Sequence, residues 1–327
     1  MINVTEIPIT DEDIEDIRLW AEAYREATDP PMPWGRFAKE IGDIGQSTLE
    51  GFVKGYYNGN KAVQARKIFR YRQTIEAQTK RQEKLPVNPG FFETETSLRL
   101  EGLLLMAHGG RITAAGTGPG TGKTMSIREY KHKSSNCYVA TMRPSSQRVL
   151  PMIQQVQKAL GMPGLRMPTR DASQMVIDKL IDRKALLVVD EANYLSIEAI
   201  EELRSWHDET GVGIALFGNE ELIAQIESGG KSDQLARLNR RISHRHIQKV
   251  PTEGDVDTFC DAWGIKQGDI RGYLRRIALT PHAGGLGECQ QLIEAASLIA
   301  DGEDREFLSI TDLRDAQMAR STRWVKA

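Results

Sequence analysis

A glycine-rich run between two regular elements constrains the fold of this chain more than any other feature. Residues 116–124 read Gly-Thr-Gly-Pro-Gly-Thr-Gly-Lys-Thr. Residues 111–115 before the run predict a strand, and residues 126–133 after it predict a helix. Glycines let successive backbone N–H groups curl around a phosphate, and the N-terminus of the helix adds positive partial charge. The run therefore predicts a phosphate-binding loop of the P-loop class, with Thr117 in the first slot of the usual G-x-x-x-x-G-K-[ST] spacing.

The side chains of this loop predict the ligands. Lys123 would neutralise the β and γ phosphate oxygens of ATP, and the Thr124 hydroxyl would ligate Mg²⁺. We expect seven consecutive residues to bind the nucleotide: Gly118, Pro119, Gly120, Thr121, Gly122, Lys123 and Thr124.

Two carboxylates follow an apolar run further along the chain. Residues 185–189 predict a buried parallel strand, and Asp190 and Glu191 come directly after it. Asp190 would hold Mg²⁺ together with Thr124, and Glu191 would be the catalytic base that polarises the attacking water. The alternative role for such adjacent acids is a helix cap.

A polar amide ends the next predicted strand, residues 213–217. Asn219 follows this strand after one glycine. Its side chain could contact the attacking water or the γ phosphate from the neighbouring strand, which makes it a catalytic candidate. Taken alone, Asn219 is equally typical of a turn.

Strand-like and helical segments alternate through the middle of the chain. Further strands are predicted at residues 137–142 and 246–250, and helices near 96–107, 147–160, 173–182, 196–207 and 220–227. Such alternation predicts an α/β fold with a parallel sheet flanked by helices. From Thr252 onward only amphipathic helical spacing remains, which predicts a helical lid. We therefore predict four segments: 1–84 as an N-terminal helical domain, 85–91 as a Pro-rich linker, 92–251 as the nucleotide-binding domain and 252–327 as the lid.

The predicted N-terminal domain carries a helix-turn-helix pattern. Short helices are expected at residues 36–41 and 47–54, with Gly42 in the turn and a longer basic helix after residue 60. We interpret this domain as DNA-binding, and a plain helical bundle is the alternative. Residues 6–29 are acid-rich, whereas residues 61–84 are strongly basic, so the formal net charge of −2 hides a polarity along the chain.

Composition excludes several other classes of protein. Three scattered cysteines, Cys137, Cys260 and Cys289, offer neither a disulfide framework nor a C-x-x-C metal site, so we expect no transition metal. The alternation around His244 and His246 suits a strand edge better than a metal site. Apolar runs are too short to span a bilayer, and we expect a cytoplasmic protein without membrane contact.

The order of these motifs resembles one family, the AAA+ ATPases, and within it the target-DNA activators of transposition typified by transposition protein B of phage Mu. The resemblance covers most of the chain. It rests on Tyr57-Asn58-Gly59 after the helix-turn-helix, Phe92-Glu93-Thr94-Glu95-Thr96, the phosphate loop, Asp190-Glu191-Ala192, Glu201-Glu202-Leu203-Arg204, Gly218-Asn219, and Ala236-Arg237-Leu238 followed by Arg241-Ile242.

The resemblance implies roles for further residues. Asn219 would be the sensor-1 residue, and Arg241, or its neighbours Arg237 and Arg240, would supply an arginine finger to the ATP of the next subunit. Where the family tends to place an arginine in the lid, this sequence has Gly285-Leu286-Gly287-Glu288. Three arginines match the family's DNA-contacting loops: Arg143, Arg166 and Arg170.

The function that this resemblance implies is an ATP-dependent protein that binds double-stranded DNA with little sequence preference. It would form a homo-oligomer, either a helical filament or a ring, and deliver target DNA to a cognate transposase in the cytoplasm of a bacterial host. ATP hydrolysis would be slow and dependent on assembly. The alternative is a helix-turn-helix transcription regulator with an ATPase module, which would give a base-specific footprint. A secretion-type ATPase, the third candidate, normally needs a membrane segment.

Overall fold

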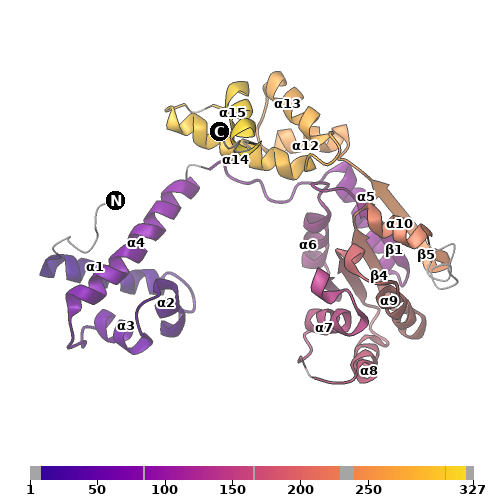
Figure 1. Cartoon of the computed structure of the whole chain (residues 1–327), viewed down its shortest axis with the longest axis horizontal. Helices are drawn as coiled ribbons and strands as arrows, with labels where there is room; N and C mark the ends of the chain where they lie inside the picture. Colours follow the sequence, from indigo (N-terminus) through magenta and orange to yellow (C-terminus); the bar gives the residue numbers. More distant parts are fainter. Residues whose placement is uncertain (1–8, 84, 165, 229–238, 306, 322–327) are drawn as a thin grey trace, which may run out of the picture. The chain divides into compact units, whose positions relative to one another are not determined.

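The computed structural model describes residues 9–83, 85–164, 166–228, 239–305 and 307–321. The chain divides into two compact units, Met1–Leu85 and Pro86–Ala327 (Figure 1).

The first unit is helical. Its elements are α1 (Asp11–Glu26), α2 (Trp34–Ile41), α3 (Gln46–Val53) and α4 (Lys61–Glu83). Gly42 ends α2 with a φ of 97°, a conformation that favours glycine, and residues 42–45 form the turn to α3. Buried Phe37, Leu49 and Ile68 bring α2, α3 and α4 around one core. The predicted helix-turn-helix arrangement is therefore present.

Helix α1 is an addition to the predicted elements, since the acidic composition of residues 6–29 predicts charge and no element. Thr10 begins the helix with a capping box, in which its side chain accepts from the Asp13 backbone N–H and Asp13 accepts in return from Thr10. Three acids lie in the first turn, where negative charge stabilises a helix. The acid-rich composition is therefore part of a helix start.

The second unit is built on a five-stranded parallel sheet. Its strands are β1 (Ile112–Thr117), β2 (Cys137–Thr141), β3 (Leu186–Asp190), β4 (Gly213–Gly218) and β5 (Ile242–Gln248). The strand order is β2-β3-β4-β1-β5, and every pair is parallel. The predicted α/β fold with a parallel sheet is confirmed.

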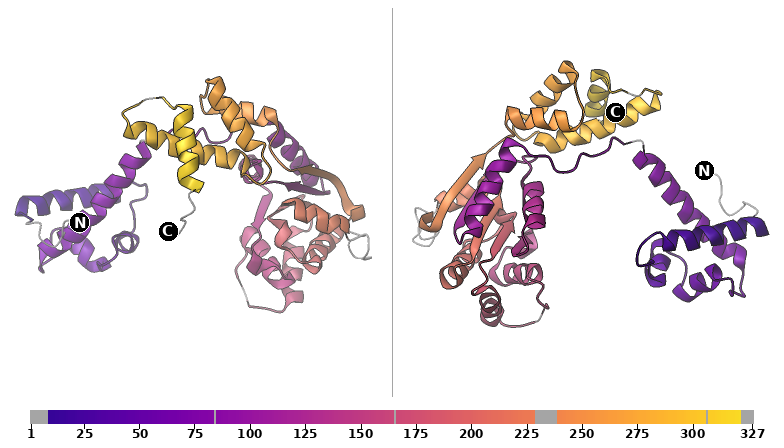
Figure 2. Two further views of the ribbon diagram at one scale, coloured as in Figure 1. Left: turned by 45° about the horizontal axis from the view of Figure 1, so that its top comes forward. Right: turned by 180° about the vertical axis from the view of Figure 1, so that it is seen from behind.

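Helices cover both faces of this sheet (Figures 1 and 2). One face packs against α5 (Glu95–His108) and α6 (Lys123–Lys133), and the other packs against α7 (Val149–Ala159), α8 (Thr169–Leu180), α9 (Ile197–Thr210) and α10 (Glu220–Ser228). Alternate residues of each central strand enter opposite clusters, as Leu187 and Val188 of β3 do. Because both faces are covered, the central strands read as continuous apolar runs.

The edge strand β5 begins four residues earlier than predicted, at Ile242 instead of His246. Pairing with β1 sets its position, from Ile112 opposite Ile242 to Thr117 opposite Gln248. An edge strand tolerates polar residues, so its composition gave little guidance to its bounds. His244 and Arg245 are exposed on this edge, in agreement with the predicted strand edge.

Four helices complete the second unit: α12 (Glu253–Ala262), α13 (Gly268–Ala278), α14 (Gly285–Gly302) and α15 (Ile310–Ser321). They bury a core of their own, which includes Phe259, Leu274 and Leu292. Phe92, from the segment before α5, packs against this core. The predicted C-terminal helical lid is therefore present. Its core is also contacted by the segment that leads into the α/β layer.

Candidate functional site

The glycine run forms a braced loop between β1 and α6. The Gly118 N–H donates to the Gln248 carbonyl at 2.8 Å, and the Thr121 hydroxyl donates to the Gly118 carbonyl at 3.0 Å. A Cβ at Gly118 would lie 2.0 Å from the Lys249 carbonyl oxygen. Only glycine permits this approach, so β5 fixes the start of the loop and the following N–H groups are held in place.

Lys123 is the first residue of α6, three positions earlier than the helix start that the sequence predicts. Its Nζ donates to the Thr117 carbonyl at 2.6 Å, which folds the side chain back over the loop. Burial lowers the pKa of Lys123, and the charges of Glu191 and Asp190 act in the opposite direction. The charges of the two carboxylates therefore offset part of the effect of burial on the Lys123 ammonium.

Asp190 is the last residue of β3 and is only 4% exposed. Its Oδ1 accepts from the Glu191 N–H at 3.0 Å. Burial raises the pKa of Asp190, and the neighbouring charge of Glu191 raises it further. Glu191 itself has a φ of 56°, in the left-handed region that non-glycine residues rarely adopt. The chain thus turns sharply after β3.

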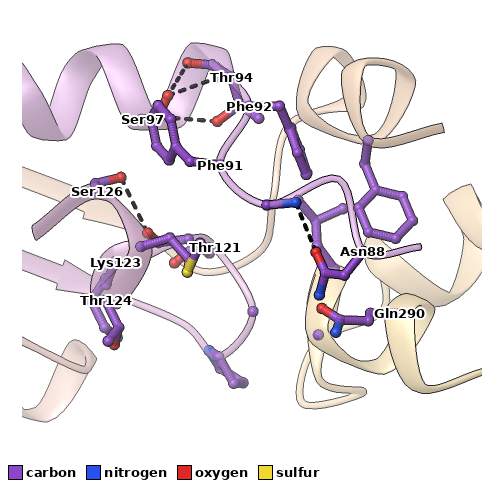
Figure 3. A pocket seen from close by; sticks show the side chains of 18 of the residues that line it. Asn88, Phe91, Phe92, Thr94, Ser97, Thr121, Lys123, Thr124, Ser126 and Gln290 are labelled. Atoms are coloured by element: carbon purple, nitrogen blue, oxygen red, sulfur yellow. Dashed lines mark hydrogen bonds between the residues drawn. The ribbon is translucent and has the colours of Figure 1, made fainter. Parts of the chain in front are cut away.

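Lys123 and Glu191 both line a pocket of about 370 Å³, whereas Asp190 is not among its described lining residues. Figure 3 shows loop residues such as Lys123 and Thr124 on one side and Asn88 and Gln290 on the other. Glu191 lines the same space. The remaining wall is largely apolar, and its members come from the segment before α5 and from the lid: Phe91, Phe92, Phe259, Trp263 and Leu286. Pockets with apolar walls and a few fixed polar groups are typical of nucleotide and cofactor sites.

The lid contacts the phosphate loop through backbone atoms. The Leu286 N–H donates to the Gly120 carbonyl at 3.1 Å. A Cβ at Gly120 would lie 2.0 Å from the Gly284 carbonyl oxygen, and Gly120 has a φ of 68°. Loop and lid therefore touch where neither can carry a side chain, and Gly287 takes part in the pocket wall.

The residues present fit Mg²⁺. This ion prefers hard oxygen ligands and keeps several waters, and a threonine hydroxyl beside one carboxylate provides such ligands. Thr124 and Asp190 would hold it. Among the described residues no cluster of three or more His, Cys, Asp or Glu side chains forms a transition-metal site.

Asn219 follows β4 and caps helix α10. Its Oδ1 accepts from the Glu221 N–H at 3.0 Å, and its Nδ2 donates to the Glu221 carboxylate at 3.2 Å. Its own N–H donates to Asn193 Oδ1 at 3.3 Å. Asn219 is not among the described residues that line the pocket. Asn193 therefore connects the end of β4 to the turn after Glu191. Its role was not predicted, and the one feature of the sequence that pointed to it is its position three residues after Asp190.

Arg241 lies at the end of the parallel strands opposite to the phosphate loop. It directly precedes β5, whereas the phosphate loop follows the other end of the neighbouring strand β1. The seven residues of β5 span about 20 Å at the usual strand rise. Arg241 is 57% exposed and pairs with Asp208, with 3.1 Å between Nε and Oδ1. It therefore cannot reach the loop of its own chain. Arg240 is also described and lies beside it, and Arg237 lies outside the described residues.

The three predicted DNA-contacting arginines are exposed and lie apart from the pocket lining. Arg143 follows β2, Arg166 lies in the connection between α7 and α8, and Arg170 is in the first turn of α8. Arg166 and Arg170 follow the C-terminal end of α7, whereas Arg143 precedes its N-terminal end.

Comparison with known proteins identifies both parts of the second unit. Residues 108–226 match the family model of an AAA domain, and residues 240–319 match that of the Mu B transposition protein, C terminal. The ATP-dependent target DNA activator B of Escherichia phage Mu is 28% identical over 261 residues, which are 80% of this chain and 82% of that protein. The chain contains an AAA domain and is similar to transposition protein B of phage Mu.

Other relatives agree with this assignment. The Mu-like prophage FluMu DNA transposition protein B of Haemophilus influenzae is 27% identical, with 79% of this chain and 89% of that protein covered. Among solved structures, the Aeropyrum pernix ORC1 protein in complex with DNA superimposes with a TM-score of 0.55 at 14% identity, covering 73% of this chain and 69% of that one. At such low identity the structural likeness establishes the AAA+ fold alone. No helix in the described part of this AAA+ protein is long and apolar enough to cross a membrane.

Proposed function

We propose that this chain binds ATP, assembles as a helical homo-oligomer on double-stranded DNA with little sequence preference, and delivers that DNA to a cognate transposase whose activity it stimulates. The observation that carries the proposal is the single pocket formed by the phosphate loop, Glu191 and the lid. The relatives named as ATP-dependent target DNA activators support it. Such a protein would work in the cytoplasm of a bacterial host, where ATP and target DNA occur together.

The residues of the pocket suggest how ATP would be held. The N–H groups from Gly118 to Thr124 and the Lys123 ammonium would bind the phosphates. Mg²⁺, when bound, would neutralise charge on the phosphate oxygens, with Thr124 and Asp190 as its protein ligands. Since Lys123 now donates to the Thr117 carbonyl, ATP binding would exchange that contact for a phosphate oxygen.

Hydrolysis would use residues of two subunits. Glu191, placed at the pocket by the turn after β3, would act as general base toward water. Asn219 would have to exchange its capping contact with Glu221 to serve as a sensor of the γ phosphate. Arg241 lies about one strand length from its own loop, so it would complete the site of a neighbouring subunit. Hydrolysis would then be slow until subunits assemble.

DNA contact would be made through phosphates. Arg143, Arg166 and Arg170 are all exposed, and arginines bind phosphate oxygens without reading bases. These contacts would position the protein on any duplex.

A transcription regulator is the second candidate, because the first unit has a helix-turn-helix whose α3 begins with exposed Gln46 and Ser47. Such side chains can read base edges in the major groove. Protection of one short sequence at all protein concentrations would favour this candidate. Protection that spreads along any duplex would favour the oligomer.

The proposal is tested by electron microscopy and DNA binding of the full chain with ATP or ADP, using two variants. Lys123→Ala should lose ATP binding and DNA assembly together. Glu191→Gln should bind ATP and keep the assembled state, because the phosphate contacts remain while the base is lost. Lys131→Ala, an exposed lysine of the same helix α6, is the matched control and should behave as wild type. Wild-type hydrolysis by Glu191→Gln would contradict the role of Glu191.

A further inference from the structure

The polar groups that line the pocket outside the phosphate loop differ in what they already bind. Thr94 and Ser97 form the capping box of α5, in which the Ser97 N–H donates to Thr94 Oγ1 at 3.0 Å and the Thr94 N–H donates to Ser97 Oγ at 2.8 Å. Two amide side chains, Asn88 and Gln290, line the same space and face the apolar wall described above. In Figure 3 they lie together, on the side away from Lys123.

The orientation of each amide is fixed by a partner of unambiguous chemistry. Asn88 Oδ1 accepts from the Gly90 backbone N–H at 2.9 Å, which can only donate, so Asn88 Nδ2 is left as a donor. Gln290 Nε2 donates to Glu294 Oε1 at 2.9 Å, and a carboxylate can only accept, so Gln290 Oε1 is left as an acceptor. The end wall thus offers one donor and one acceptor beside each other.

We propose that Gln290 and Asn88 select adenine as the base of the bound nucleotide, an inference that rests on the nucleotide site proposed above. Adenine carries an amino group next to ring nitrogens that accept hydrogen bonds. Gln290 Oε1 accepts from that amino group, and Asn88 Nδ2 donates to the adjacent ring nitrogen. The aromatic side chains of the wall, such as Phe91 and Trp263, contact the faces and edges of the base.

Guanine is disfavoured at the same place. It carries a carbonyl oxygen where adenine carries the amino group, so two acceptors would face each other at Gln290. Glu294 prevents the simplest remedy, because a rotated Gln290 amide would turn its oxygen toward the carboxylate. A mismatched hydrogen-bonding pair of this kind discriminates by roughly 10- to 100-fold. Glu294 is therefore a positioning residue, although it is not among the described residues that line the pocket.

The test measures the affinities of the full chain for ATP and for GTP by calorimetry or competition. Gln290→Leu removes the acceptor at similar size, and ATP affinity should fall by on the order of tenfold while GTP affinity changes little. Asn88→Asp keeps the acceptor for the Gly90 N–H but removes the donor, and it should also weaken ATP binding.

Glu294→Gln tests whether Glu294 orients the Gln290 amide, because a purely structural role would leave the ratio of ATP to GTP affinity unchanged. A glutamine can donate to Gln290, so the Gln290 amide is free to rotate and present its nitrogen to the base. GTP affinity should therefore rise and the ATP-to-GTP ratio should fall several-fold. Gln291→Leu, an exposed neighbour on the same helix α14, is the matched control and should leave the ratio unchanged.

The outcomes separate this inference from the function on which it rests. Equal wild-type affinities for ATP and GTP, or an unchanged ratio in both Gln290→Leu and Glu294→Gln, would overturn the assignment of the amides and leave the nucleotide site standing. Failure of the wild-type chain to bind either nucleotide would overturn the proposed function, and the base assignment with it.

Discussion

Replacing Asp255 with alanine removes the polar junction between the α/β layer and the lid. Asp255 lies in the first turn of α12 and is 1% exposed. Its carboxylate accepts from the Thr96 N–H at 2.9 Å, from the Thr252 N–H at 2.8 Å and from the Thr96 hydroxyl. Gln248 of β5 also donates to Thr96 Oγ1, at 2.7 Å. One carboxylate therefore connects the start of α5, the end of β5 and the lid.

The expected cost follows from these contacts. Each of the three donors would lose a charged acceptor inside a buried junction, at roughly 1.5 kcal/mol or more each. Allowing for some relaxation, Asp255→Ala should lower the free energy of unfolding of the second unit by about 4 kcal/mol. For a unit of this size that corresponds to a fall in Tm of roughly 8–16 °C.

The assay is thermal unfolding of the full chain, followed by ATP affinity at a temperature where each variant is folded. ATP affinity should fall as well, because α5 and α12 carry opposite parts of the pocket wall, including Ser97 and Phe259. Asp269→Ala is the matched control: Asp269 also lies in the first turn of a lid helix, but it is exposed and accepts only from the adjacent Ile270 N–H. Its effect should stay within about 0.5 kcal/mol. Equal Tm values for the two variants would refute the reasoning.

Three further predictions concern the proposed function. Arg241→Ala should reduce ATP turnover by on the order of 10³-fold, and mixing it with Lys123→Ala subunits should restore activity. A mixture as inactive as its components, although mixed oligomers form on DNA, would exclude a finger in trans. Replacing Arg166 and Arg170 with alanine should weaken binding to unrelated duplexes equally and reduce the salt slope by roughly two. An unchanged salt slope would show that other residues contact the DNA. Burial lowers the pKa of Lys123, so its ammonium should lose its proton at a pH below the ordinary lysine value of 10.5. ATP affinity should therefore fall as the pH rises through that lowered pKa. Adenosine affinity, which needs no phosphate contact, should stay level over the same range.

The sequence predicted the parts of the fold that depend on residues near one another in the chain. Buried strands such as β3 and β4 are continuous apolar runs, because both faces of the sheet are covered, and their predicted bounds agree within one residue. The edge strand β5 was misplaced, since polar residues such as His244 carry no comparable signal. Helix α1 was missed because its capping acids were considered only as charge.

Local sequence also determined the phosphate loop, because its glycines, its lysine and the helix start are consecutive and their geometry follows from backbone conformation. Contacts between distant residues were decided only by the tertiary structure. The approach of Gly120 to Gly284 joins residues more than a hundred positions apart. So does the pairing of Thr96 with Asp255. Nothing in either local pattern specifies the partner, because such contacts form only when the sheet and the lid pack against each other. The pocket wall follows from that packing, whereas the distance between Arg241 and its own loop follows from the pairing of β5 with β1.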